Sequence, residues 1–262
     1  MVHRPLPFKA LLIDFDNTLV LFNEDEFLIA YAKLAYPYLS EYFDEATFFQ
    51  KLLQSTLHMM HNNGQQLNVA AFTNHFIAET PSLSFEECID RFQSFYNESF
   101  RQLETTVQVV PYGRQLIHQA IDAKLQVVIA TNPIFPQKAT EIRLSWANLA
   151  DLDIAFITHA ENMSYCKPKL EYYQAILERL GYRPEDCIMA GNDRISDMAA
   201  SALGIHTFLV DLDQEKGRVG MLSKEIGNST KKTVTSKYRI DAQGALQDLS
   251  RYLFSSEHVN LS

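Results

Sequence analysis

The chain has 262 residues, enough for one large domain or two smaller ones. Apolar residues make up 47% of it and allow a substantial core, while the formal net charge of -9 argues against non-specific binding to a nucleic-acid backbone, which needs a concentrated basic face. Because no apolar run approaches the ~20 residues that span a bilayer and residues 1–10 lack the apolar segment of a signal peptide, we expect a cytoplasmic protein that binds neither membranes nor nucleic-acid polymers.

Short runs of aliphatic and β-branched residues predict the strands of a sheet. Runs this short and this continuous are typical of strands buried on both faces. Helical stretches punctuated by proline and glycine lie between them. The alternation predicts an α/β fold with a parallel, doubly wound, Rossmann-like sheet. The predicted strands are residues 10–13, 125–130, 154–157, 187–190 and 207–210, and the predicted helices are residues 114–123, 136–147, 168–180 and 194–203.

An acidic segment, Asp14-Phe15-Asp16-Asn17-Thr18-Leu19, directly follows the first predicted strand. Residues two apart on a strand point to the same side, so Asp14 and Asp16 are expected to face one site. Neighbouring carboxylates repel each other unless a cation lies nearby or one of them is protonated. An ionised carboxylate can act as a nucleophile, while a protonated neighbour can give its proton to a leaving group. An acidic turn that caps a helix fits the segment equally well.

The segment over residues 22–106 has no comparable strand run and shows helical spacing. Its aromatic residues recur one turn apart, namely Phe72 and Phe76, then Phe92, Phe95, Tyr96 and Phe100. Such stripes usually form the core of a small helical bundle, so we interpret them as packing and not as a ligand pocket. We therefore expect a helical domain over residues 22–106, inserted into an α/β core formed by residues 1–21 and 107–262.

Polar residues also follow two later strands. Thr131 and Asn132 follow the strand at 125–130, whereas Gly191, Asn192 and Asp193 follow the strand at 187–190, with Asp197 one turn further on. Ligand sites in open α/β sheets lie beyond the carboxyl ends of the strands, so these clusters are expected to converge on the acidic segment. This convergence is the strongest argument for an active site.

Each of these residues has a structural interpretation beside the chemical one. Thr131 can donate its hydroxyl to a phosphoryl oxygen, or it belongs to an ordinary strand-to-helix turn. Asp193 and Asp197 can hold a cation that prefers oxygen ligands, or they cap a nearby helix. Lys167 precedes Pro168 at a predicted helix start, where the helix dipole disfavours a cation. That position indicates a bound anion such as phosphate, unless the lysine is simply solvated.

The last part of the chain begins with a connection over residues 211–236 that is rich in Gly, Ser, Thr and Lys. A connection of this length is uncommon in a compact domain, and one short helix is predicted within it at residues 218–226. Beyond the connection, we predict an edge strand at residues 238–240 and a closing helix at residues 242–254.

The polar motifs occur in the order Asp-x-Asp-x-Thr, Thr-Asn, Lys-Pro and Gly-Asn-Asp-x-x-x-Asp. This order resembles the four motifs of the haloacid dehalogenase superfamily. A single motif is weak evidence, whereas four in order are strong. The resemblance covers residues 8–21 and 107–211. It implies that the insert at residues 22–106 is a cap that closes over the site and selects the substrate.

The resemblance assigns catalytic roles. Asp14 would be the nucleophile that forms an aspartyl-phosphate, and Asp16 would be the acid that later activates water. Thr131 would bind the transferring phosphoryl group together with Asn132. Lys167 would stabilise Asp14 and the developing charge, and it would also contact the phosphate.

The resemblance also implies a Mg²⁺ site. The ion would be held by Asp14, the main-chain carbonyl of Asp16 and Asp193, and Asn192 and Asp197 would support these ligands. The fourth motif reads Gly-Asn-Asp where many members have Gly-Asp, so Asn192 and Asp193 compete for one ligand position. Asp193 is preferred, because a carboxylate binds a hard cation better than an amide does.

Asp16 also bears on the type of reaction. Superfamily members that cleave carbon–halogen or carbon–phosphorus bonds look as if they lack this second aspartate, so its presence favours phosphoryl transfer from oxygen. We predict a magnesium-dependent phosphatase, monomeric or homodimeric, that hydrolyses a small phosphorylated metabolite or a nucleotide monophosphate. Two alternatives stay open: a phosphomutase acting on a sugar phosphate, and a catalytically idle metal-binding module whose cap is an interaction surface.

The first motif departs from the common pattern at one position. Asn17 stands where many superfamily members have glycine, and asparagine accepts unusual backbone angles better than most residues.

Overall fold

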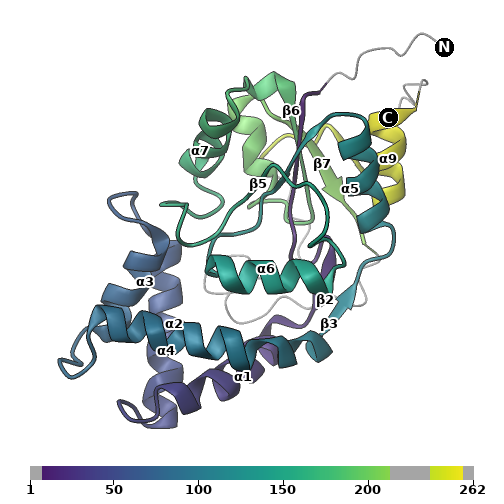
Figure 1. The fold of residues 1–262 in the computed structure, drawn as a ribbon. Helices are drawn as coiled ribbons and strands as arrows, with labels where there is room; N and C mark the ends of the chain where they lie inside the picture. The colour runs from purple at the N-terminus through teal and green to yellow at the C-terminus, as the bar shows by residue number, and fades with distance from the viewer. Residues whose placement is uncertain (1–7, 213–236, 256–262) are drawn as a thin grey trace.

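The computed structural model describes residues 8–212 and 237–255, and its centre is a parallel sheet (Figure 1). The sheet order is β5-β4-β1-β6-β7-β8, and every neighbouring pair is parallel. The prediction of a parallel, doubly wound α/β sheet is therefore confirmed. The strands are β1 (Ala10–Ile13), β4 (Gln126–Ile129), β5 (Phe156–Ile157), β6 (Cys187–Gly191), β7 (His206–Val210) and β8 (Ala242–Gly244).

Both faces of the sheet are buried, which explains why its strands are almost continuously apolar. Alternate residues of β1 belong to different clusters: Leu11 and Ile13 pack with α5 and α9, whereas Ala10 and Leu12 pack with α7. The helices that cover the sheet are α5 (Gly113–Asp122), α6 (Gln137–Trp146), α7 (Leu170–Leu180) and α9 (Leu246–Phe254), and 3₁₀ helices lie at Pro184–Asp186 and Met198–Leu203.

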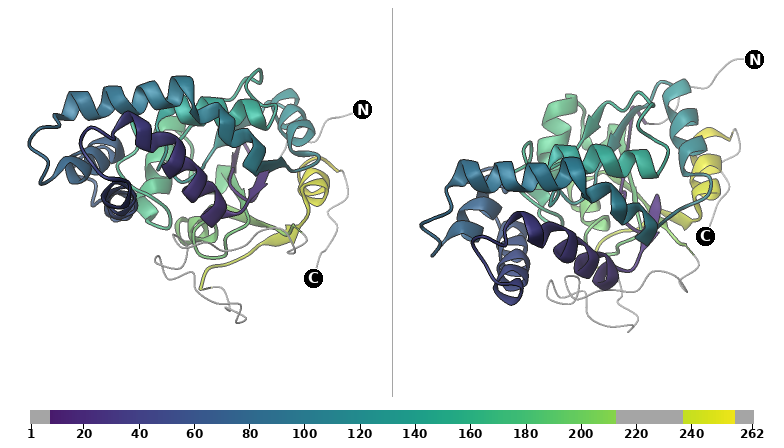
Figure 2. Two further views of the ribbon diagram at one scale, coloured as in Figure 1. Left: turned by 90° about the horizontal axis from the view of Figure 1, so that it is seen from below. Right: turned by 60° about the horizontal axis from the view of Figure 1, so that its bottom comes forward.

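The segment at residues 22–106, called the helical insert below, contains α1 (Glu24–Ala35), α2 (Glu45–Met60), α3 (Asn68–Ile77) and α4 (Phe85–Glu98), with 3₁₀ helices at Tyr36–Tyr38 and Phe100–Thr106. In both views of Figure 2 these helices lie at one end of the sheet, opposite α9. The chain enters and leaves the insert through an antiparallel pair, β2 (Val20–Phe22) and β3 (Val107–Val109), in which Phe22 lies opposite Val107. The predicted domain limits at 21/22 and 106/107 fall in this pair, and the division itself stays a prediction.

Helix α6 joins the two parts, since it lies between the sheet and the insert (Figure 1). Its Leu144 packs into the cluster that Leu11 and Ile13 of β1 form with α5 and α9. Its Ala139, Ile142 and Trp146 pack into the aromatic core of the insert. The Trp146 ring stacks on Phe100 at a centroid distance of 5.3 Å. One helix therefore belongs to both cores, so the insert is held against the sheet by packing as well as by its two connections.

Three predicted elements differ from the structure. The helix expected at 194–203 is a 3₁₀ helix that begins only at Met198, because the side chain of Asp193 bonds the preceding turn. The edge strand expected at 238–240 lies instead at Ala242–Gly244, since the Asp241 side chain accepts the Thr207 N–H and occupies the sheet edge just before the pairing begins. The closing helix consequently begins at Leu246.

Some of the predictions are not addressed by the structure. The short helix at 218–226 and residues 213–236 of the predicted connection lie outside the described residues. In the part of the chain that is described, no helix combines the length and the apolar character needed to cross a membrane. The cytoplasmic location and the monomeric or homodimeric state stay predictions.

Candidate active site

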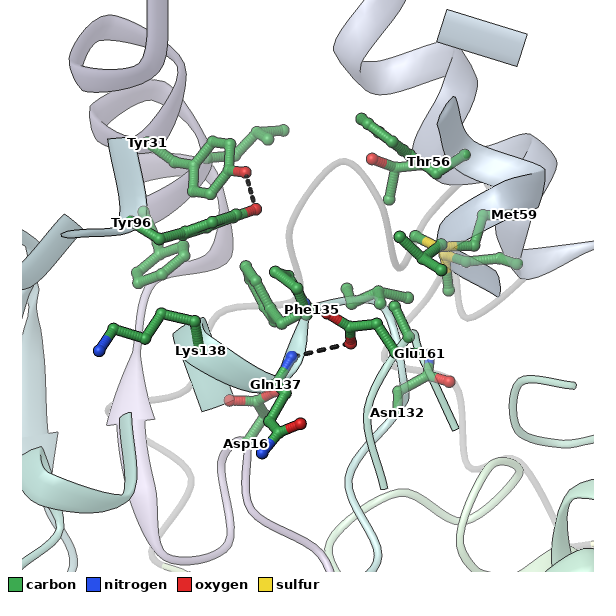
Figure 3. Close-up of a pocket in the computed structure, with 18 of the residues that line it drawn as sticks. Asp16, Tyr31, Thr56, Met59, Tyr96, Asn132, Phe135, Gln137, Lys138 and Glu161 are labelled. Carbon is green, nitrogen blue, oxygen red and sulfur yellow. Dashed lines mark hydrogen bonds between the residues drawn. The ribbon is translucent and has the colours of Figure 1, made fainter. Parts of the chain in front are cut away.

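A cavity of about 720 Å³ lies where the carboxyl ends of β1, β4 and β6 face the helical insert. Asp16 and Asn132 lie on the sheet side of it, whereas Tyr31, Thr56 and Met59 come from the insert (Figure 3). The convergence predicted from the sequence is therefore observed. The predicted site residues that line the cavity are Asp14, Asp16, Asn132, Lys167, Asn192, Asp193 and Asp197.

Lys167 lies between two carboxylates at the floor of this cavity. Its Nζ is 2.7 Å from Asp14 Oδ1 and 2.6 Å from Asp197 Oδ1, and its side chain is only 2% exposed. Burial opposes the charge of Lys167, but the two carboxylates together raise its pKa well above the usual value. Burial and the Asp14 charge in turn raise the pKa of Asp197. The anions near Lys167 are thus protein carboxylates, and two of them share one ammonium group.

The turn after β1 holds Asp14 in place. The Asp14 N–H donates to Ala190 O at 2.8 Å and so extends the β1–β6 ladder by one residue. The buried Thr18 hydroxyl lies 3.1 Å from Asp14 Oδ2 and 3.2 Å from Asn192 Oδ1. Asn17 has a φ of 56°, in the left-handed region that asparagine tolerates. Both oxygens of Asp14 are therefore oriented by neighbouring groups.

Asp16 has a different environment, because it forms an ion pair with Arg143 of α6. The Arg143 side chain is 3% exposed, and its guanidinium lies between two rings, 4.9 Å from the Phe15 centroid and 4.6 Å from that of Phe135. Burial raises the pKa of Asp16 to about 6, with Arg143 opposing the shift and Asp14 adding to it. Asp16 still keeps 27% exposure towards the cavity. It can therefore carry a proton near neutral pH and exchange it with a ligand.

Arg143 was not among the residues expected from the sequence. One signal was available, since Arg143 lies four residues after Ala139 and three before Trp146, on the apolar stripe of its helix. A charged residue at a core-facing position needs a partner. The sequence alone does not indicate that this partner is Asp16.

Thr131 and Asn132 have distinct positions. The Thr131 side chain does not line the cavity; it is buried, and its Oγ1 has no hydrogen-bond partner among the described residues. The Thr131 carbonyl accepts hydrogen bonds from Thr158 Oγ1 at 2.7 Å and from the Tyr172 hydroxyl at 2.9 Å. Asn132 lines the cavity, and its Oδ1 accepts the Lys167 N–H at 3.2 Å. Asn132 therefore holds the backbone of Lys167.

The fourth motif folds tightly around Asp197. A Cβ on Gly191 would lie 2.2 Å from Asp197 Oδ2, so only glycine fits there. Asp197 Oδ2 accepts the Asp193 N–H, and Asp193 Oδ1 accepts the main-chain N–H groups of Ile195 and Ser196. Both carboxylates thus make hydrogen bonds within the local turn, as expected if these residues have a structural role. In contrast, Asn192 Oδ1 lies within hydrogen-bond distance of the Thr18 hydroxyl, which also contacts Asp14.

The predicted magnesium site depends on few side chains. Within residues 8–212 and 237–255, no group of three or more His, Cys, Asp or Glu side chains is arranged to hold a metal ion. The predicted set differs from such a group, because it includes a main-chain carbonyl of Asp16 beside Asp14 and Asp193. Oxygens of Asp14, Asn192 and Asp193 line one cavity, and a hard cation prefers oxygen ligands. The donor set therefore fits Mg²⁺.

The interpretation of the aromatic stripes as packing alone was incomplete. Phe95 and Phe100 are fully buried in the core of the insert, as interpreted. Phe72, Phe92 and Tyr96, however, also line the cavity. Helical spacing identifies a buried face, but it does not distinguish a face that meets another helix from one that borders a cavity. The stripes therefore form part of the wall of a cavity as well as the core of the insert.

Comparisons with known proteins identify the family and the fold of the chain. Residues 8–203 match the family model of haloacid dehalogenase-like hydrolases, and no curated protein matches the sequence. The fold is similar to that of a HAD phosphatase from Thermococcus onnurineus, with 17% identity, coverage of 96% of this chain and 100% of the other, and a TM-score of 0.55. It is equally similar to L-2-haloacid dehalogenase from Xanthobacter autotrophicus, with 18% identity, coverage of 95% and 100%, and a TM-score of 0.56. The magnesium-bound HAD-hydrolase YfnB from Bacillus subtilis has 18% identity, coverage of 94% and 98%, and a TM-score of 0.50.

Replacing Arg143 should change the titration of Asp16. In Arg143→Gln, the pKa of Asp16 should rise above its value of about 6, because burial remains while the opposing positive charge is lost. Carboxyl ¹³C NMR of the metal-free protein measures this pKa, and Asp16→Asn identifies the signal. Arg101→Gln is the control, since Arg101 also bonds α6 but does so at an exposed site. An unchanged or lowered pKa in Arg143→Gln would contradict the role of Arg143.

Proposed function

Because the chain belongs to the haloacid dehalogenase-like hydrolases, we propose that it is a magnesium-dependent phosphatase that hydrolyses a small phosphate monoester. The observation that carries this proposal is the contrast between Asp14 and Asp16. Asp14 accepts a hydrogen bond from the Lys167 ammonium, which holds this carboxylate in place as the proposed nucleophile. Asp16 has a pKa raised to about 6 and can supply a proton. A nucleophile and an acid therefore stand two residues apart.

The reaction we propose has two steps. In the first, an Asp14 carboxylate oxygen attacks phosphorus, the bond from phosphorus to the ester oxygen breaks, and Asp16 gives its proton to the departing alkoxide. In the second, the ionised Asp16 takes a proton from water, which attacks the aspartyl-phosphate and releases inorganic phosphate. Asp14 is then an ionised carboxylate again, and Asp16 is protonated.

The neighbouring residues position these two carboxylates. Lys167 holds Asp14 and offsets the charge that develops on the phosphoryl oxygens. We propose that the Thr131 hydroxyl, which is buried outside the cavity lining and lacks a partner among the described residues, is uncovered when the substrate binds and then donates to the phosphoryl group. Arg143 keeps the Asp16 carboxyl in one orientation through its ion pair. The chain thereby supplies an oriented nucleophile, an acid and compensating positive charge.

We propose that the magnesium ion is held by Asp14, the main-chain carbonyl of Asp16 and the fourth motif. When bound, magnesium would neutralise charge on the phosphoryl oxygens. Asp193 is the better ligand on charge, but its Oδ1 already accepts two N–H groups. Asn192 Oδ1 shares the Thr18 hydroxyl with Asp14, which favours Asn192 as the direct ligand and Asp193 as the residue that shapes the turn.

We also propose that the helical insert at residues 22–106 is a cap domain. Its four α-helices contribute to the cavity wall opposite Asp14 and Asp16. A cap excludes water from the reaction and determines which ester reaches the nucleophile.

A haloacid dehalogenase is the second candidate, because a dehalogenase has an equally similar fold. The environment of Asp16 argues against it. A departing halide needs no proton, whereas a departing alkoxide does, so a carboxyl with a pKa near 6 beside the nucleophile serves only the ester. Release of halide from a 2-haloacid, with no phosphate release from esters, would reverse this preference.

Asp14→Asn should lower kcat at least about 10³-fold while the fold persists. An amide is a poor nucleophile, and it has nearly the same shape as the carboxylate. Phosphate release from p-nitrophenyl phosphate measures the loss, and circular dichroism checks the fold. Asp153→Asn, at an exposed carboxylate, is the matched control. Activity near that of the wild type in folded Asp14→Asn would rule out this mechanism.

Asp16→Asn should slow esters with poor leaving groups the most. Alkyl phosphates need the proton of Asp16, whereas p-nitrophenolate departs without one. In the wild type, kcat/KM for an alkyl phosphate should fall as pH rises through about 6, because the proton is lost there, and this limb should vanish in Asp16→Asn. Steady-state rates on both esters from pH 5 to 9 test the role, and equal losses on the two esters would contradict it.

Mg²⁺ should raise the melting temperature of the metal-free protein, because a ligand that binds the folded state stabilises it. Asn192→Ala should weaken the apparent Mg²⁺ affinity by at least about tenfold, since it removes a ligand oxygen. Asp193→Asn should weaken it less, because the amide oxygen still accepts the two N–H groups. Thermal shift titrations measure both values. The reverse order would return the ligand role to Asp193, and no shift in the wild type would contradict the metal site.

A further inference from the structure

We infer that the substrate is the phosphate ester of a neutral, ring-bearing alcohol. The leaving group would then be neither a small acid nor a second phosphate. The inference builds on the proposed phosphatase function and concerns the other end of the same cavity. Three properties of the cavity support the inference: its volume, the chemical character of the side chains in its walls and the sign of their charge.

The size of the cavity exceeds what a small metabolite needs. About 720 Å³ lies in the range of pockets that enclose drug-sized ligands, ~300–1,000 Å³. A phosphoryl group at Asp14 occupies only the floor. The space above it, towards Thr56 and Met59 of α2, is large enough for one or two rings (Figure 3). A small leaving group would leave this apolar space unfilled.

Each α-helix of the insert contributes an aromatic or thioether group to the walls above the floor. These groups include Phe27 of α1, Met59 of α2, Phe72 of α3 and Phe92 of α4, with Phe135 on the sheet side. The Phe27 and Phe135 rings already meet edge to face, at a centroid distance of 6.1 Å. Ring faces and a polarisable sulfur favour a planar apolar ligand over a hydrated sugar or acid.

A pair of tyrosines provides a neutral polar contact. The hydroxyls of Tyr31 and Tyr96 are 2.6 Å apart, both residues are buried, and both line the cavity (Figure 3). One hydroxyl donates to the other, and neither bonds any further group among the described residues. The second hydroxyl proton is therefore available to an acceptor on a ligand. A ring that carries a nitrogen or carbonyl acceptor matches this pair.

The charge on the cavity wall disfavours an anionic leaving group. Glu24, Glu141 and Glu161 line the cavity in addition to the carboxylates at its floor. The cations among the described lining residues are Lys138, which is exposed, and Lys167, which already pairs with Asp14 and Asp197. A carboxylate or second phosphate on the leaving group would thus meet negative charge in a poorly hydrated space. The sequence led us to expect a small phosphorylated metabolite or a nucleotide monophosphate, and of these the cavity favours the nucleotide monophosphate, whose leaving group is a neutral, ring-bearing alcohol.

Three alkyl phosphates test the inference on the wild-type protein with magnesium: propyl, 3-phenylpropyl and 3-carboxypropyl phosphate. The phenyl ring is three carbons from the ester oxygen, so propyl and 3-phenylpropyl phosphate have uncharged alcohol leaving groups of similar basicity. A buried ring should raise kcat/KM for phenylpropyl phosphate at least about tenfold over propyl phosphate. The carboxypropyl ester should be poorer than the propyl ester. Phosphate release gives all three values.

A variant that fills the ring space gives an independent check. Thr56→Phe places a ring where the ligand ring is expected, so the phenylpropyl to propyl ratio should fall to near one. Ile29→Phe is the control, because Ile29 is 48% exposed on α1 and does not line the cavity, and it should keep the ratio of the wild type. The comparison of esters on the wild type stands even if Thr56→Phe fails to fold.

The outcomes separate the inference from the function on which it depends. Equal kcat/KM for the propyl and phenylpropyl esters, or a preference for the carboxypropyl ester, would overturn the ring-bearing alcohol while leaving the phosphatase intact. Phosphate release from none of the three esters, nor from p-nitrophenyl phosphate, would overturn the phosphatase and the inference with it. A tenfold preference that Thr56→Phe removes and Ile29→Phe retains supports both.

Discussion

The site is organised around one buried ammonium group shared by two carboxylates. Lys167 comes from the segment before α7, Asp14 from the end of β1 and Asp197 from the turn after β6. Charges this deeply buried are tolerated only when they are paired with good geometry, so the three segments must meet accurately. The absence of a side chain at Gly191 allows Asp197 to approach. With both carboxylates ionised, the group would carry a net negative charge, which supports the proposal that a divalent cation binds here.

The two carboxylates of the first motif are chemically alike and differ only in their surroundings. Asp14 contacts an ammonium and a hydroxyl within the sheet, whereas Asp16 lies at the base of a mostly apolar cavity beside one guanidinium. Burial raises the pKa of Asp16 to about 6, which suits the proton donor that we propose it to be. Arg143 limits the shift of Asp16 and, held between Phe15 and Phe135, also fixes where the carboxyl points. The division of roles is therefore a property of the fold around the motif.

Much of this could be predicted from the sequence, because strands buried on both faces appear as apolar runs and polar residues at their ends must converge. The positions of Asp14, Thr131 and Asp193 just after predicted strands were informative for that reason, whereas the order of the four motifs was informative through its resemblance to a known superfamily. The missing parts depend on contacts between distant segments. The ion pair between Arg143 and Asp16 spans 127 positions, and no local pattern encodes it. Nor does helical spacing distinguish a core from a cavity wall.

The fold does not decide between the phosphatase and the dehalogenase, since proteins of both descriptions have folds about equally similar to this chain. The choice of chemistry must then lie in single side chains at the strand ends, above all Asp16. We propose that the choice of substrate lies elsewhere, in the helical insert. Helix α6 packs into the aromatic core of the insert through Trp146 and also carries Arg143, which forms the ion pair with Asp16. In the proposed reaction, one rigid helix would therefore connect the wall around the leaving group with the residue that orients the proton donor.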